Sequence, residues 1–137
     1  MFEIDFGKMR GLVPVIVQDA DSGEILMLGF LNGEAWQKTL ETGYVTFYSR
    51  TRNKLWTKGE TSGNRLKVIS AATDCDRDSL LIQVEVDGAG VVCHEGTRSC
   101  FTKVLYAPGI RGAREEHGAE DLSGAECPSR HLQEPAS

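Results

Sequence analysis

Residues 73–79 read TDCDRDS and place two kinds of metal-binding side chain in one short stretch. Asp74, Asp76 and Asp78 offer carboxylates, which bind hard cations, whereas Cys75 offers a thiolate, which binds softer ones. In an extended strand the three aspartates would point to one side and the cysteine to the other. The two ligand types are therefore expected to serve different centres.

The spacing of the aspartates also limits the local backbone conformation. Along an ideal strand, the Cα atoms of Asp74 and Asp78 would lie about 13 Å apart. Two carboxylates that bind one ion directly can span only about 10 Å between their Cα atoms. We therefore expect a bend or bulge here rather than a regular strand, unless one carboxylate binds through water.

Two other interpretations of the acidic stretch are possible. An EF-hand loop would use the same three aspartates, but Ser79 stands where that loop needs glycine, and a strand-like run follows. A solvated acidic turn would leave three repelling carboxylates with only Arg77 to neutralise them. Metal binding is the favoured interpretation, and the solvated turn is the alternative.

The segment VVCHEGTRSCF (91–101) carries two more cysteines, Cys93 and Cys100. Their spacing is not that of a zinc-finger knuckle, and a lone cysteine is often a small buried hydrophobe. Together with Cys75, however, they would give three thiolate ligands and leave a fourth position for water, as in catalytic zinc sites. His94 is a candidate for proton transfer beside such a water, with a hydrogen bond to the loop backbone as the alternative.

Residues 49–65, SRTRNKLWTKGETSGNR, concentrate basic side chains in a chain whose net charge is -5. Basic groups, and glycines whose N–H groups approach an anion, suit phosphate recognition, and an indole can stack on a base. A solvated hairpin with its tryptophan in the core is the alternative. The candidate substrate contacts are Arg50, Arg52, Lys54, Trp56, Lys58 and Arg65.

The elements that must position these residues are mostly β-strands. Strands are predicted at residues 12–18, 24–30, 44–49, 54–59, 66–72, 80–86 and 100–106. Turn residues predict hairpins at 19–23 and around 52–53. The expected fold class is α+β, with a mainly antiparallel β core and one principal helix.

That helix is predicted over about residues 32–42. Asn32 is a good N-cap, and Gly43 stands where a left-handed terminator is expected. The apolar stripe that should pack on the sheet consists of Ala35, Trp36, Thr39 and Leu40.

The bulk composition fits one soluble domain, because 40% of the 137 residues are hydrophobic and 26% are charged. The negative net charge argues against general nucleic-acid binding, and no apolar run predicts a membrane span or a signal peptide. We therefore expect a cytoplasmic protein, in which reduced cysteines favour metal ligation over disulfides. Residues 1–106 are predicted to form the domain and residues 107–137, which include Cys127, a flexible tail.

Four segments together resemble the phosphoribosyl-AMP cyclohydrolase family of histidine biosynthesis. They are GLVPVIVQDADSGEILMLGFLN, VTFYSRTRNKLWTKGETSGN, DCDRDSLL and CHEGTRSCF, and they run in order from about Gly11 to Phe101. The resemblance implies a zinc- and magnesium-dependent hydrolase that opens the purine ring of phosphoribosyl-AMP between N1 and C6. It also implies an intertwined homodimer whose zinc site is shared between the subunits.

The resemblance assigns zinc to Cys75, Cys93 and Cys100, and magnesium to the three aspartates of the acidic stretch. Zinc-bound hydroxide would attack C6 of the N1-ribosylated adenine, and His94 would carry a proton to the leaving N1. Two other classes of protein remain as alternatives. They are a non-catalytic, zinc-stabilised nucleotide-binding module and a thiol redox protein, and the absence of C-x-x-C argues against the second.

Overall fold

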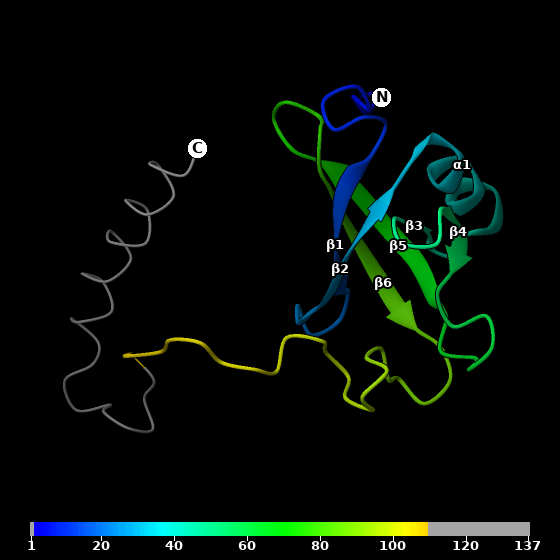
Figure 1. The fold of residues 1–137 in the computed structure, drawn as a ribbon. Coiled ribbons are helices and arrows are strands. Elements are labelled where there is room, and N and C mark those ends of the chain that lie inside the picture. The colour runs from blue at the N-terminus through cyan, green and yellow to red at the C-terminus, as the bar shows by residue number, and fades with distance from the viewer. Residues whose placement is uncertain (1, 110–137) are drawn as a thin grey trace. The chain divides into compact units, whose positions relative to one another are not determined.

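The computed structural model describes residues 2–109, and the chain divides after Thr102 into two units. Within residues 103–109, the second unit has neither helix nor strand. The elements of the first unit are β1 (Val13–Asp19), β2 (Ile25–Leu31), α1 (Gly33–Thr42), β3 (Thr46–Ser49), β4 (Lys54–Thr57), β5 (Leu66–Thr73) and β6 (Leu80–Val86) (Figure 1). The predicted flexible tail at 107–137 lies almost entirely outside the described residues and stays a prediction.

Four strands form a mixed sheet in the order β2-β1-β6-β5, in which β1 and β6 run parallel and the two outer pairs run antiparallel. The fold class is therefore α+β, as predicted, but this sheet is not wholly antiparallel. The parallel pair forms because a long connection, which includes α1 and the four strands β2 to β5, separates β1 from β6. β3 and β4 pair as a separate antiparallel hairpin.

Helix α1 is capped at both ends as the sequence predicts. The side-chain oxygen of Asn32 accepts a hydrogen bond from the N–H of Ala35 at 2.8 Å, and Gly43 adopts the left-handed conformation with φ of 81°. Thr39 Oγ donates to the carbonyl of Ala35 and accepts from the N–H of Thr46. Thr39 therefore ties the helix directly to β3.

The hydrophobic core lies between one face of the four-stranded sheet and the layer formed by α1 and the β3–β4 hairpin (Figure 1). Val13, Val15 and Val17 alternate along β1 and are fully buried. A Cβ atom at Gly29 would lie 2.6 Å from Phe47 Cδ1, so the absence of a side chain lets β2 approach β3 closely.

Two sequence predictions are wrong. Residues 100–106 form no strand, because only the N–H of Cys100 bonds to β2, at the carbonyl of Leu26, and no ladder follows. Leu40 is not part of the buried stripe of α1, since 58% of its surface is exposed. The hairpin covers only the side of the helix that carries Ala35 and Thr39.

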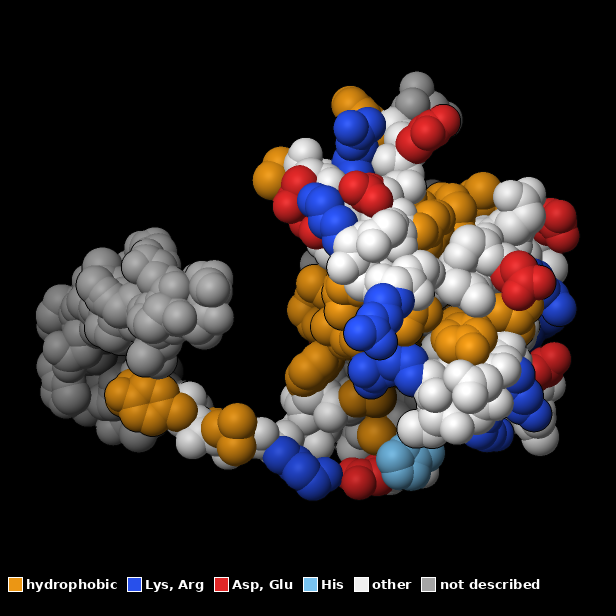
Figure 2. Space-filling model, turned by 45° about the horizontal axis from the view of Figure 1, so that its top comes forward, with side chains coloured by type: hydrophobic (Ala, Val, Ile, Leu, Met, Phe, Trp, Pro, Cys, Tyr) orange, Lys and Arg blue, Asp and Glu red, His pale blue; other side chains and the backbone are white. Residues whose placement is uncertain are grey.

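The second face of the four-stranded sheet carries apolar side chains that a single chain leaves exposed. Ile16 of β1 and Leu28 of β2 are cross-strand partners and expose 39% and 46% of their surfaces. Beside them, Gln83 Nε2 donates a hydrogen bond to Gln18 Oε1 across the parallel pair. Figure 2 shows apolar side chains reaching the surface in patches between charged groups. No helix in the described range is long and apolar enough to cross a bilayer.

Candidate metal sites and nucleotide pocket

The acidic stretch forms the turn between β5 and β6, and its backbone bends as predicted. Arg77 adopts a left-handed conformation, with φ of 63°, and its N–H donates to the carbonyl of Asp74 at 3.1 Å. Asp74 Oδ1 accepts from the N–H groups of Asp78 and Ser79. The bend brings carboxylate oxygens of Asp74, Asp76 and Asp78 to within 4.8 Å of one another.

The electrostatics of this turn suit a cation. Hydrogen bonds, first from the side chain of Ser79 and then from backbone N–H groups, lower the pKa of Asp74 to about 2. Desolvation and the neighbouring Asp76 raise the pKa of Asp78 above its ordinary value. Lys8 Nζ lies 3.4 Å from carboxylate oxygens of both Asp76 and Asp78. The three carboxylates thus form an anionic cluster that one lysine partly neutralises.

Cys93 and Cys100 lie together at the opposite end of the sheet, where each thiol shifts the pKa of the other. The N–H of Glu95 donates to Cys93 Sγ at 3.5 Å and lowers the pKa of that thiol. Desolvation, followed by the influence of the neighbouring Cys93 thiol, raises the pKa of the Cys100 thiol. A buried sulfur with a lowered pKa next to a second sulfur is a suitable donor pair for a soft metal ion.

Cys75 is not brought to this pair within one chain. It lies in the turn before β6, whereas Cys93 follows β6 and Cys100 bonds to the start of β2 (Figure 1). The seven residues of β6 alone span about 20 Å, so the turn and the pair lie at opposite ends of the sheet. One chain therefore gathers two of the three predicted zinc ligands.

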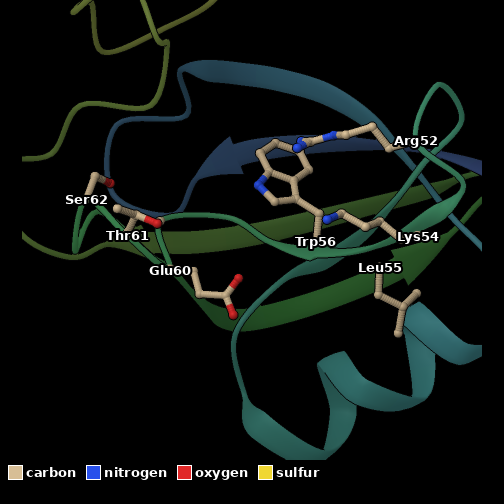
Figure 3. Close-up of a pocket in the computed structure, with 8 residues that line it drawn as sticks. Arg52, Lys54, Leu55, Trp56, Glu60, Thr61 and Ser62 are labelled. Atoms are coloured by element: carbon tan, nitrogen blue, oxygen red, sulfur yellow. The ribbon is translucent and has the colours of Figure 1, made fainter.

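A pocket of about 410 Å³ lies beside β4. Figure 3 shows its lining residues, which come from two segments. Arg52, Lys54 and Trp56 come from the hairpin, and the loop after β4 supplies Glu60, Thr61 and Ser62. Two of the predicted basic residues, Arg52 and Lys54, thus line this pocket.

Trp56 packs in the core and also lines the pocket, whereas its stacking on a base stays a prediction. Its ring packs against Phe47 with centroids 5.4 Å apart, and it also lines the pocket. Lys58 Nζ lies 5.5 Å from the centre of the Trp56 ring and is close enough to Cys100 to favour its thiolate. The ammonium group of Lys58 therefore interacts both with a residue of the pocket and with one cysteine of the pair.

The two remaining basic candidates are stacked on aromatic rings. The guanidinium of Arg50 lies 4.0 Å from the ring centre of Phe30, and that of Arg65 lies 3.9 Å from the ring centre of Tyr44. The N–H of Gly63, in the loop after β4, donates to the carbonyl of Gly59 at 2.8 Å.

His94 is exposed and follows Cys93 in a tight turn. The N–H of Gly96 donates to the carbonyl of Cys93, and the N–H of Cys93 donates to the carbonyl of Thr97. Among residues 2–109, His94 has no hydrogen-bond partner, so the alternative of a bond to the loop backbone is not seen. Its imidazole is free to meet a ligand near the cysteine pair.

The sequence analysis missed an ion pair beside the cysteine pair. Arg98 Nη2 lies 3.0 Å from Oδ1 of Asp19, whose residue surface is only 6% exposed. A signal was present in the sequence, because Asp19 continues the inward-facing alternation of Val13, Val15 and Val17. A charge at such a position requires a partner.

These features define an α+β protein with a carboxylate cluster, a thiol pair and a basic aromatic pocket. The family profile described as phosphoribosyl-AMP cyclohydrolase matches residues 27–102, which is more than half of the chain. The chain therefore belongs to the phosphoribosyl-AMP cyclohydrolase family, and the resemblance noted from its motifs is confirmed.

Curated relatives agree with this assignment. The chain is 56% identical over 105 residues to a phosphoribosyl-AMP cyclohydrolase of Desulfatibacillum aliphaticivorans, and the match covers 77% of this chain and 83% of the relative. It is 62% identical over 99 residues to the histidine biosynthesis bifunctional protein HisIE of Bacteroides thetaiotaomicron, covering 72% and 48%. The HisIE protein of Escherichia coli strain K12 is 61% identical over the same length, with the same coverage. The chain thus spans about half the length of the bifunctional relatives.

Proposed function

We propose that this protein is a phosphoribosyl-AMP cyclohydrolase, a cytoplasmic hydrolase that opens the N1–C6 bond of an N1-ribosylated adenine during histidine biosynthesis. The observation that carries the proposal is the 56% identity to a relative of this name over 83% of that relative's length. The carboxylate cluster, the thiol pair and the pocket at β4 all fall within the matched segment, which supports the proposal.

Zinc is proposed to bind Cys93 and Cys100 of one subunit and Cys75 of the partner subunit. The adjacent thiols, one with a lowered pKa, fit a soft divalent ion, and the third cysteine is too far away within the same chain. When bound, zinc supplies the Lewis acid that activates water for attack on C6. Cys93 and Cys100 hold two of its ligand positions.

The homodimer is proposed to form through the second face of the four-stranded sheet. Ile16 and Leu28 leave an apolar strip on this face that a second copy would cover. If two sheets pack face to face about an axis perpendicular to their strands, the start of β6 in one subunit meets the end of β6 in the other. Such packing brings Cys75 of the partner subunit to the cysteine pair and creates two equivalent sites.

Magnesium is proposed to bind Asp74, Asp76 and Asp78. Their oxygens lie within 4.8 Å of one another, and magnesium prefers carboxylate oxygens together with water and phosphate. The turn that carries them also carries Cys75, so the two proposed metal sites are neighbours in the dimer. The aspartates would hold the ion where a substrate phosphate or sugar hydroxyl can reach it.

The residues of the hairpin and His94 are proposed to handle the substrate. Trp56 offers a ring face for the base, and Arg52 and Lys54 offer positive charge for a phosphate at the same pocket. Lys58, whose Nζ lies 5.5 Å from the centre of the Trp56 ring, offers a further positive charge. His94, which has no hydrogen-bond partner within residues 2–109, would move the proton to the leaving N1.

The purified protein should be incubated with phosphoribosyl-AMP while absorbance reports ring opening. Turnover is expected, with loss of activity after zinc chelation and recovery when zinc is added back. Tight binding of the nucleotide without turnover would instead indicate a zinc-stabilised binding module. Turnover that survives complete removal of zinc would contradict the proposed chemistry.

A further inference from the structure

The loop at residues 87–101 carries both cysteines of the pair, although it contains no helix or strand. Cys93 lies in a tight turn closed by its bonds with Gly96 and Thr97. Cys100 is fixed separately, because its N–H donates to the carbonyl of Leu26 on β2 at 2.8 Å. Besides the buried side chain of Val92, a polar contact holds the Cys93 turn relative to Cys100.

Arg98 makes that contact, from a position between the two cysteines. Its Nη1 donates to the carbonyl of Gly90 at 2.9 Å, on the segment that leads into Cys93. Its Nη2 lies 3.0 Å from Asp19 Oδ1 at the end of β1, and its Nε lies 3.4 Å from Glu24 Oε1. One guanidinium group therefore joins the loop to the turn between β1 and β2.

The anchor of this contact is rigid. Asp19 is buried, and its Oδ2 accepts hydrogen bonds from the N–H of Ser22 at 2.9 Å and from Ser22 Oγ at 2.7 Å. The next residue of the loop is anchored to the start of the neighbouring strand β2, because Ser99 Oγ donates to the carbonyl of Ile25 at 2.8 Å. The carboxylate of Asp19 is thus held in place before Arg98 reaches it.

The space around Arg98 is equally restricted. A Cβ atom at Gly90 would lie 2.9 Å from Arg98 Nη1, and Gly90 has a positive φ of 79°. A lysine at position 98 would keep the charge, but a single ammonium group cannot reproduce the fork of a guanidinium that meets separate acceptors.

We propose that Arg98, held by Asp19, is a positioning residue that presets the separation of Cys93 and Cys100 for zinc. In this role it acts by fixing the loop that carries the two sulfurs, through Gly90, Asp19 and Glu24. This inference rests on the proposed function, because it takes the cysteine pair as zinc ligands. Outer-shell partners of this kind change metal affinity by about 10–100-fold when they are replaced.

The test compares zinc affinity in full-length Arg98→Lys and Asp19→Asn with that of the wild-type protein, by competition with a chromophoric chelator. Both variants should bind zinc at least about tenfold more weakly. Arg10→Lys, at an exposed arginine outside the loop, is the matched control and should bind like wild type. With cobalt in place of zinc, the thiolate charge-transfer band of both variants should weaken or shift while their circular dichroism stays native.

Affinities and cobalt spectra of Arg98→Lys and Asp19→Asn equal to wild type, while Cys93→Ser loses zinc, would overturn the inference and leave the proposed function intact. A wild-type protein that binds no zinc would overturn both. If Arg98→Lys fails to fold, the zinc affinity of the nearly isosteric Asp19→Asn decides whether the inference holds. If both variants fail to fold even in excess zinc, the contact serves general stability, and the positioning role is refuted.

Discussion

The ammonium group of Lys8 lies 3.4 Å from a carboxylate oxygen of Asp78, in the turn between β5 and β6. The same nitrogen lies 3.4 Å from Asp76 and donates to the carbonyl of that residue. The N-terminal segment therefore places a positive charge against the cluster that is proposed to bind magnesium. Any cation that enters the cluster meets the repulsion of this lysine.

Replacing Lys8 with glutamine should strengthen magnesium binding. Removal of one exposed charge of the same sign is worth up to about 1 kcal/mol, which corresponds to roughly a two- to fivefold gain in affinity. Isothermal titration of zinc-loaded protein with magnesium measures this effect. Lys67→Gln, on an exposed position of β5, is the control, and an affinity of Lys8→Gln equal to or below that of the control would contradict the prediction.

The stability of the protein should depend on the ionisation of Asp19. The side-chain hydrogen bond from Ser22, its backbone N–H and the charge of Arg98 lower the pKa of this carboxyl. Because the folded-state pKa is lowered, the ionised carboxylate stabilises the fold above the unfolded-state pKa of about 3.9. That contribution is lost as the pH falls through the folded-state value.

Asp19→Asn should therefore lower the free energy of unfolding by about 1–3 kcal/mol at pH 7 and by much less near pH 2. Urea unfolding of both proteins at the two pH values gives the comparison. A difference between variant and wild type that is the same at both pH values would show that ionisation of Asp19 does not contribute.

The close approach of β2 and β3 predicts a marked cost for a side chain at position 29. In Gly29→Ala the new Cβ would lie 2.6 Å from Phe47 Cδ1, so overpacking should cost about 1–3 kcal/mol of stability. Gly33→Ala is the matched control, because no atom lies within 4 Å of its new Cβ and it stands in α1. Thermal unfolding should show a lower midpoint for the first variant only, and equal midpoints would count against the described packing.

His94→Ala should separate metal binding from proton transfer. The variant is expected to retain zinc and to lose about 10²–10⁴-fold in kcat, since general acid–base groups contribute that much. Zinc content by elemental analysis and steady-state kinetics with phosphoribosyl-AMP provide the two readouts. Unchanged turnover would place the proton carrier elsewhere, and loss of zinc would make His94 a ligand.

Much of the fold was predictable because its signals are local. Val13, Val15 and Val17 mark the inner face of β1 by alternation, and Asn32 and Gly43 mark the ends of α1. The parallel pairing of β1 with β6 was not predictable, because alternation within a strand does not reveal its neighbour or its direction. The prediction of a strand at 100–106 was wrong for a related reason. Apolar residues alone do not show whether a neighbouring strand has a free edge with which to pair.

The candidate site divides in the same way. The bend at the aspartates was predictable, because two carboxylates on one ion cannot span the Cα separation that a regular strand would give them. The separation of Cys75 from Cys93 became visible only when β6 was seen to span the sheet between them. The partner of Asp19 is Arg98, from a distant loop, and such tertiary pairs are not encoded in spacing along the chain.

The proposed hydrolytic zinc site is completed by two subunits, and a mixing experiment distinguishes this arrangement from a site within one chain. Cys75→Ser and Cys93→Ser are each expected to be inactive alone. In a mixed dimer, Cys75 of the second variant meets the intact Cys93 and Cys100 of the first, so one of the two sites is whole. An equimolar mixture after subunit exchange should recover about one quarter of wild-type phosphoribosyl-AMP cyclohydrolase activity. A mixture that stays inactive although mixed dimers have formed would contradict the shared site.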